Sequence, residues 1–278
     1  MPLFSSVSFV TNIAKGYTLP QALGIAARNG FELAEIASIA GMCEHIAPSD
    51  ITPEYIRSVS DMLARENMNS YAFAGHVDLT EEDGLSAFLK KMDLASGIGC
   101  KVINTNSGPA GRIGEFRVNI RKVIDKAERL GLTVCLESHG DIVGTAKDSA
   151  GLFREINHPL LRFNYDTGNT YYYAKGDVAI EEDILYALEY MAYVHVKDIE
   201  ITGDAAHYRP IGAGDLDFEK IFGALRQFGK PLHCGLEIPV FVAGDLNALA
   251  SSAAPIGEDE IAGALKQSLD CMRGQGAC

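Results

Sequence analysis

The sequence of 278 residues predicts a (β/α)8 TIM barrel that forms a single domain over residues 1–278. Short runs rich in Val, Ile, Leu and aromatic residues alternate with longer amphipathic stretches. Eight such pairs occur, and successive strands begin about 26–40 residues apart, the span of one strand, one helix and two loops. A barrel of this kind needs about 250 residues, so eight strand–helix units account for the whole length.

The strand pattern is clearest in eight short segments. We predict strands at residues 7–11, 33–38, 69–74, 101–106, 133–137, 161–166, 193–197 and 233–238. A doubly wound open sheet is the alternative, and it typically carries a glycine-rich phosphate loop after its first strand. The first strand is followed instead by Asn12-Ile13-Ala14-Lys15. This favours the barrel.

The segments between the strands carry helix signals. Thr18 precedes Pro20, and Thr52 precedes Pro53, so each pair combines a capping hydroxyl with an early proline. Gly131 follows a run with helical periodicity and indicates a helix end. We predict helices opening near residues 18, 52 and 80 and helices spanning 115–130, 147–156, 180–191, 218–228 and 258–272. Long connections at 203–214 and 239–255 follow the seventh and eighth strands, where barrels build sites and lids.

Composition argues against several classes of function. The chain has 37 acidic and 24 basic residues, a net charge of −13, so clustered cations for a nucleic-acid partner are not expected. No stretch approaches the roughly 18 apolar residues of a membrane span, and the start lacks the pattern of a signal peptide. The six cysteines are scattered without a C-x-x-C pair. We therefore predict reduced thiols, a cytoplasmic location and no membrane partner.

Four consecutive predicted strands end in reactive side chains. These are Glu137, Asp166, His195 and Glu237, each placed after apolar residues. The active site of a barrel lies at the carboxyl ends of its strands. Three carboxylates and an imidazole that converge there would repel one another without a cation, whereas separate salt-bridged residues would require four coincidences. We predict one divalent metal ion, Mn²⁺ first and Mg²⁺ or Co²⁺ as alternatives, because oxygen ligands predominate.

The motifs around these residues resemble a known family. They read LESHG at 136–140, YDTGN at 165–169, VHVKD at 194–198, YRPIGAGDLDF at 208–218 and GLE at 235–237. Over most of its length the chain is similar to the xylose-isomerase-like superfamily of sugar isomerases and epimerases, which includes tagatose/psicose 3-epimerases and inosose dehydratases. The resemblance implies that Glu137, Asp166, His195 and Glu237 are the metal ligands. It also implies that Glu137 and Glu237 act as catalytic acid and base, and that the protein is a homodimer or homotetramer.

Proton transfer next to a carbonyl is the chemistry that such a site can perform. A metal stabilises the enediolate that forms while one glutamate removes the proton and the other returns one. We predict a sugar isomerase or epimerase acting on a keto-sugar or sugar derivative. A lyase, either a dehydratase or a β-eliminase on a 3-keto-sugar or inosose, shares the intermediate and is the alternative. A DNA-repair endonuclease would need several zinc ions and a basic groove, and a metal-free sugar-binding protein would need no metal.

Six further residues are candidates for binding the substrate. Lys197 shares strand parity with His195, and His139 shares it with Glu137, so both side chains are expected at the pocket mouth. Ketose 3-epimerases usually carry a histidine where this chain has Asn169, and an arginine where it has Ile201. These departures favour a modified keto-sugar, an acid or an inositol derivative over free tagatose or psicose. The candidates are His139, Asn169, Lys197, Arg209 (in place of the missing arginine), and His76 and Asn106 at the ends of the third and fourth strands.

One loop resembles a phosphate-cradling loop. It reads Gly212-Ala213-Gly214, and only Lys220 follows it closely among basic residues. Glycines alone are weak evidence for phosphate binding, so phosphate is a minor alternative.

Overall fold

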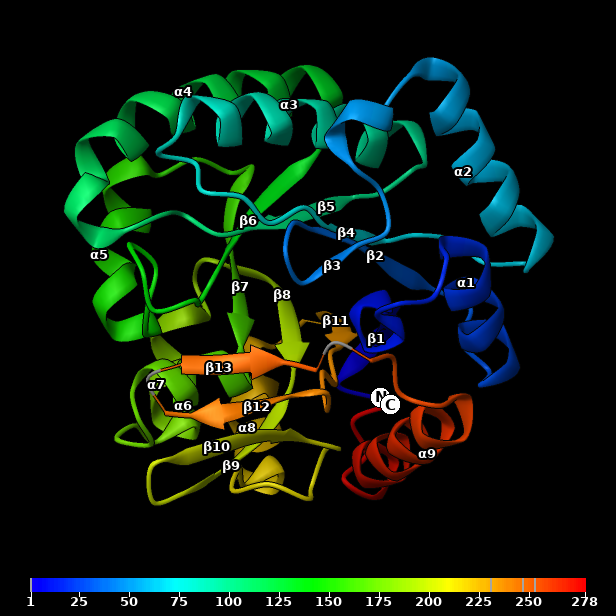
Figure 1. The fold of residues 1–278 in the computed structure, drawn as a ribbon. Helices are drawn as coiled ribbons and strands as arrows, with labels where there is room; N and C mark the ends of the chain where they lie inside the picture. Colours follow the sequence, from blue (N-terminus) through cyan, green and yellow to red (C-terminus); the bar gives the residue numbers. More distant parts are fainter. Residues whose placement is uncertain (1, 231, 247, 253) are drawn as a thin grey trace.

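Eight parallel strands close into a barrel in the computed structural model, which describes residues 2–230, 232–246, 248–252 and 254–278 (Figure 1). The barrel closes because the first strand pairs with both the second and the last. This confirms the predicted (β/α)8 TIM barrel. In chain order the barrel strands are β1 (Phe4–Val10), β2 (Ala34–Ile39), β4 (Ala72–Ala74), β5 (Val102–Thr105), β6 (Thr133–Glu137), β7 (Leu161–Asp166), β8 (Met191–Val196) and β11 (Leu232–Leu236).

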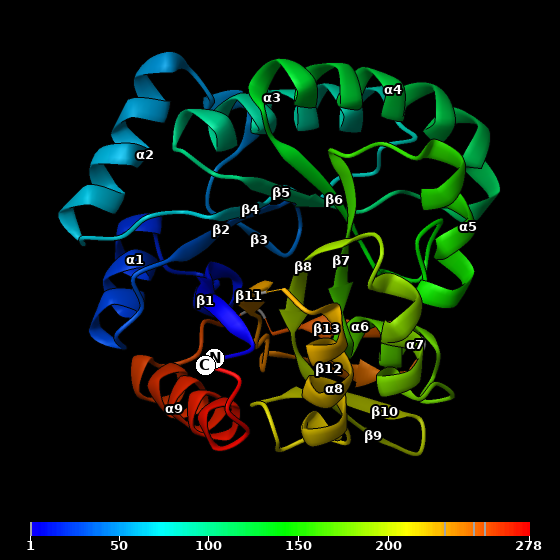
Figure 2. The same ribbon diagram turned by 180° about the vertical axis from the view of Figure 1, so that it is seen from behind.

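Helices surround the barrel, and Figure 2 shows the ring from behind. The chain ends meet where the Phe4 amide donates to the Ala277 carbonyl at 2.8 Å. The predicted start at Thr52 is confirmed by its hydroxyl, which accepts from the Tyr55 amide at 3.1 Å. The helices are α1 (Leu19–Arg28), α2 (Pro53–Arg65), α3 (Glu82–Gly97), α4 (Ile113–Leu130), α5 (Ala146–Ile156), α6 (Thr167–Tyr173), α7 (Ile180–Ala187), α8 (Phe218–Leu225) and α9 (Glu258–Gly274).

Two predicted helices are shorter in the structure, and the one predicted at 218–228 ends at Leu225, before a 3-10 turn over Arg226–Phe228. The predicted helix at 180–191 ends at Ala187, and the next strand begins at Met191 rather than at Tyr193. The reason is sheet pairing, because Met191 is already in register with Phe163 of β7. The helical periodicity of the sequence therefore predicts helix for residues that pair as a strand in the barrel. No helix in the described part of the chain is long and apolar enough to cross a membrane.

The two long connections after β8 and β11 contribute to a second sheet. Its strands are antiparallel in the order β13-β12-β10-β9, and Figure 1 shows them at the carboxyl ends of β7 and β8. We call this the cap sheet. Residues 247 and 253 of the predicted 239–255 connection lie outside the described residues. The strands are β9 (Asp198–Thr202), β10 (Ala205–Arg209), β12 (Val242–Asp245) and β13 (Ala248–Ser251).

A small hydrophobic cluster holds the cap sheet in place. Ile199, Tyr208 and Val242 of the sheet pack with Tyr172 of α6, and Met42 packs against the same cluster. Met42 lies in the turn before β3 (Cys43–Glu44), a short strand antiparallel to the end of β2. Apolar burial therefore fixes the sheet above the barrel mouth.

A buried lysine joins two of the barrel strands. Lys91 of α3 is 1% exposed, and its Nζ donates to the carbonyl of Ser38 at 2.6 Å. The carbonyls of Gly75 and His76 lie within 3.4 Å of the same nitrogen. Burial lowers the pKa of Lys91 to about 8. The amine thus connects the carboxyl ends of β2 and β4 beneath the barrel mouth.

Replacing Lys91 with Met should change how stability depends on pH. Between about pH 8 and 10.5 the unfolded chain binds more protons at this amine than the native protein does, so its contribution to stability rises with pH. The difference in unfolding free energy, wild type minus Lys91→Met, should therefore increase over this window by on the order of 2–3 kcal/mol. Urea unfolding of the wild type and the variant at about pH 8 and about pH 10.5 measures this difference. Lys90→Met, at the exposed neighbouring position, is the matched control, and a difference independent of pH would contradict the expectation.

Candidate metal centre and active site

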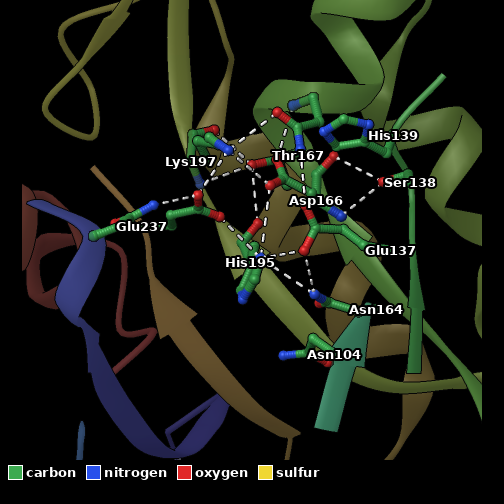
Figure 3. A network of polar contacts seen from close by, with 12 residues as sticks. Asn104, Glu137, Ser138, His139, Asn164, Asp166, Thr167, His195, Lys197 and Glu237 are labelled. Atoms are coloured by element: carbon green, nitrogen blue, oxygen red, sulfur yellow. Dashed lines mark hydrogen bonds and ion pairs between the residues drawn. The ribbon is translucent and has the colours of Figure 1, made fainter. Parts of the chain in front are cut away.

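Four adjacent barrel strands bring four potential ligands together. Glu137 ends β6, Asp166 ends β7, His195 lies near the end of β8, and Glu237 directly follows β11. All four are buried, and one ligand atom from each lies within 4.8 Å of the others. Figure 3 shows Glu137 and Glu237 on either side of His195. The cluster therefore consists of the residues that the sequence predicts as metal ligands.

The geometry of this cluster fits a single cation. His195 Nδ1 lies 2.9 Å from an oxygen of Glu137, 2.9 Å from an oxygen of Glu237 and 3.7 Å from Asp166 Oδ2. Ligands of one ion at about 2.0–2.2 Å lie within roughly 4.5 Å of one another, so small side-chain adjustments would let all four bind. Glu237 Oε2, the oxygen that faces His195 Nδ1, is buried and has no other hydrogen-bond partner among the described residues. This donor set could hold a divalent metal ion.

The charges in the cluster support the same conclusion. Burial alone would raise the pKa of Glu137, but the neighbouring His76 and His195 outweigh it and hold that pKa well below its usual range. Burial is likewise outweighed at Glu237, where Lys197 and His195 lower the pKa. For Asp166, burial prevails and raises the pKa to about 6 despite Lys197. The buried cations of the protein thus compensate Glu137 and Glu237, whereas they compensate the Asp166 carboxylate less fully.

Glu237 is fixed by two donors on the side away from the cluster. Its Oε1 accepts from Asn12 Nδ2 at 2.7 Å and from Lys197 Nζ at 2.9 Å. Lys197 also donates to Asp166 Oδ2 at 3.2 Å and lies 4.8 Å from the ring centroid of Tyr208. The prediction that Lys197 points to the pocket mouth agrees with this position. In the sequence, Asn12 only argues against a phosphate loop, and no motif predicts its contact with Glu237.

Glu137 is fixed by three donors. Asn169 Nδ2 donates to its Oε1 at 2.8 Å, and His76 Nε2 and Asn164 Nδ2 lie 2.9 Å and 3.1 Å from its Oε2. The Asn169 amide is in turn positioned by Tyr208, whose hydroxyl donates to Asn169 Oδ1 at 2.8 Å. Asn169 and His76 therefore orient a carboxylate as well as facing the pocket.

Behind His195 lies a carboxylate that the sequence reasoning missed. Glu35 of β2 is fully buried, and its Oε1 lies 3.0 Å from His195 Nε2. The same oxygen accepts from Asn104 Nδ2 at 2.7 Å. A carboxylate on the far nitrogen fixes the tautomer and ring orientation of a metal-ligating histidine. Glu35 therefore directs His195 Nδ1 toward the cluster.

A pocket of about 400 Å³ opens above the cluster, a size suited to a small ligand. Five of the six predicted substrate-binding residues line it: His76, Asn106, His139, Asn169 and Lys197. The exception is Arg209, which lies exposed on β10 and pairs with Glu200. The structure does not bring the Arg209 side chain to the pocket.

Part of the pocket wall comes from the cap sheet, which lies in connections that the sequence predicts as loops. Val242 and Leu249 of the cap sheet line the pocket together with Ile39 and Met42. Tyr173 lines it as well, with its ring centroid 5.0 Å from that of His139. The alternation of Ile199 and Ile201 in β9 was the one sequence signal for this sheet.

The fold and the site define a class, a (β/α)8 barrel with a candidate metal centre at the ends of four strands. The model of the xylose isomerase-like TIM barrel family matches residues 23–273. The chain belongs to this family.

Three comparisons illustrate the relationship. The L-ribulose-5-phosphate 3-epimerase UlaE of Salmonella typhi is 25% identical over 169 residues, which cover 57% of this chain and 56% of that protein. The chain thus spans about half the length of the curated relatives it matches. The D-allulose 3-epimerase of a Methylomonas species in complex with D-allulose has a TM-score of 0.71 at 18% identity, covering 99% and 98% of the two chains. The probable 3-DHS dehydratase AsbF of Bacillus anthracis has a TM-score of 0.69 at 15% identity, covering 94% and 97%.

Proposed function

We propose that this protein is a divalent-metal-dependent sugar epimerase or isomerase that acts on a keto-sugar or sugar derivative through an enediolate. The observation that carries the proposal is the placement of Glu137 and Glu237 on either side of His195, with both carboxylates lining one pocket. Two carboxylates on opposite sides of a bound substrate can remove a proton and return one. The epimerase names among the relatives support this class of reaction.

Glu137, Asp166, His195 and Glu237 would hold the metal ion. Three carboxylates and one imidazole favour Mn²⁺, with Mg²⁺ or Co²⁺ as alternatives. When bound, the cation supplies a Lewis acid that stabilises the negative charge developing on the substrate oxygens.

The residues of the chain supply the proton transfers. The low pKa of Glu137 and Glu237 favours the ionised form of both, so one can accept the substrate proton directly, whereas the other must first take up a proton before it returns one. Lys197 and Asn12 hold one oxygen of Glu237, and Asn169 holds one oxygen of Glu137, so each carboxylate has a defined direction. Orientation of this kind is a large part of acid–base catalysis.

Incubation with a panel of keto-sugars in deuterated water tests the proposal. An epimerase or isomerase incorporates deuterium without loss of water, which mass spectrometry and NMR detect. A lyase instead produces an enone or deoxy-diketone that absorbs in the ultraviolet, and the similarity to a dehydratase makes it the second candidate. Absence of both solvent exchange and elimination across the panel would contradict both functions.

Replacing Glu35 with Gln should weaken metal binding although it changes none of the four proposed metal ligands. An amide can present either a donor or an acceptor to His195 Nε2, so the ring orientation is no longer fixed. The dissociation constant for Mn²⁺ should rise by about 10–100-fold, measured by calorimetry on the metal-free protein. Glu32→Gln, at the exposed end of the same segment, is the control. Unchanged Mn²⁺ affinity in a folded Glu35→Gln variant would contradict the role of Glu35.

The remaining predictions concern the surroundings of the protein. All six cysteines are free thiols, which supports a reducing compartment such as the cytoplasm. The partner we propose is a small carbohydrate, with no nucleic acid and no membrane. The homodimer or homotetramer stays a prediction, which sedimentation would test.

A further inference from the structure

The pocket has little cationic charge for an anionic substrate. Among the described residues that line it, Lys197 is the single Lys or Arg. Its Nζ already lies within 3.2 Å of carboxylate oxygens of Asp166 and Glu237. Two carboxylates, Glu137 and Glu237, also face the same space. A phosphate or carboxylate group on the substrate would therefore find no unpaired Lys or Arg among the described residues that line the pocket.

Two positions of the kind where a barrel commonly binds phosphate are filled by side chains of this protein. They are the loop after the seventh strand and the N-terminus of the helix that follows it. The amides of Gly212 and Gly214, in the loop that resembles a phosphate cradle, both donate to Asp198 Oδ2, at 2.9 Å and 2.8 Å. At the start of α8, Asp217 Oδ1 accepts from the Lys220 amide at 3.2 Å. Both candidate anion sites thus hold an internal carboxylate.

One part of the pocket lining is apolar. Val242 and Leu249 of the cap sheet and Ile39 and Met42 near the end of β2 line it. Met42, Val242 and Leu249 belong to or pack on the small cluster beneath the cap sheet, so burial holds these side chains in place. A hydroxymethyl or phosphorylated end of a sugar would be desolvated here without a polar partner, whereas a methyl group would be favourably buried.

From these contacts we propose that the site takes an uncharged keto-sugar whose end remote from the reacting carbons is apolar, such as the methyl end of a deoxyketose. The inference rests on the proposed function. It separates this chain from a sugar-phosphate epimerase, the activity named for its curated relatives.

Three matched ligands test the proposal: a 6-deoxyketohexose, its 6-hydroxy parent and the 6-phosphate of that parent, each as a stereoisomer panel. Solvent deuterium exchange measures turnover, and calorimetry on the Mn²⁺-loaded protein measures binding. We expect kcat/KM to be about tenfold higher for the best deoxyketose than for its parent. We expect it to be at least about 100-fold lower for the phosphate. A phosphate ester used as well as its parent, or a parent used as well as its deoxy form, would overturn the proposal.

A pair of lysine variants tests the apolar wall directly. Leu249→Lys places a cation on the pocket side of β13 and should narrow the gap in kcat/KM between parent and phosphate by about three- to tenfold. Ala250→Lys, on the exposed neighbouring position that does not line the pocket, should leave the gap unchanged. If both variants change the gap in kcat/KM equally, the result would argue against an apolar pocket wall at Leu249.

Binding and exchange separate this inference from the proposed function. If the deoxyketose binds most tightly, its parent less tightly and the phosphate least, but none shows solvent exchange, the proposed substrate class stands and the proposed reaction is wrong. Exchange that is fastest with the phosphate would keep the reaction and overturn the substrate class.

Discussion

Glu237→Gln is expected to abolish solvent exchange, lowering kcat by at least about 10³-fold. The amide cannot accept the substrate proton, and it removes one of three anionic ligands from the cluster. The amide oxygen can still accept from Asn12 and Lys197, which turns the amino group toward His195 and the cluster. Glu137→Gln should have a similar effect, because Asn169 and His76 hold that carboxylate in the same way.

Two measurements make the result interpretable. Metal analysis of the purified variant shows whether the lost activity comes from proton transfer with the ion retained or from loss of the ion. Glu155→Gln, a carboxylate on the exposed side of α5 that pairs with Arg117, is the matched control and should keep full activity. Turnover of Glu237→Gln at the wild-type rate would remove the basis of the proposed mechanism.

The metal centre could be predicted from the sequence because it depends on a local rule. In a parallel barrel the residue that ends each strand lies at one rim, so Glu137, Asp166 and Glu237 had to lie near one another once the strands were assigned. Strand parity likewise placed Lys197 beside His195. Both inferences need only the approximate carboxyl ends of the strands and the closure of the barrel, and the structure confirms the closure.

Features that depend on distant pairs could not be predicted in this way. Glu35 meets His195 across 160 positions, and inside an otherwise apolar strand its inward direction has no local signal. The strands of the cap sheet are short, and β12 and β13 contain Ala and Gly where strands usually carry β-branched residues. Tertiary contacts with Tyr172 and Phe241 stabilise them instead. The sequence offers Arg209 only as a substitute for the arginine missing at Ile201, and pairing with Glu200 keeps it outside the pocket.

Removal of the metal is expected to have the second large effect. Dialysis against excess chelator should lower the exchange rate by more than about 10²-fold, because a carboxylate in water is too weak a base for the carbon acid without the Lewis acid. Addition of Mn²⁺ should restore the rate, and the melting temperature should rise with Mn²⁺ concentration, because the ion binds the folded protein.

A ligand variant identifies where that ion binds. His195→Ala removes the nitrogen that lies 2.9 Å from both glutamates, so the purified variant should retain much less metal than the wild type under the same dialysis. His158→Ala is the control, since His158 lies near Glu128 outside the pocket. Because His195 bonds Glu35 on one nitrogen and faces the carboxylates with the other, its loss should reduce metal retention more than Glu35→Gln does. A larger loss of metal from Glu35→Gln than from His195→Ala would show that the cation is held elsewhere. Full turnover of the wild-type protein in excess chelator would exclude the metal-dependent mechanism.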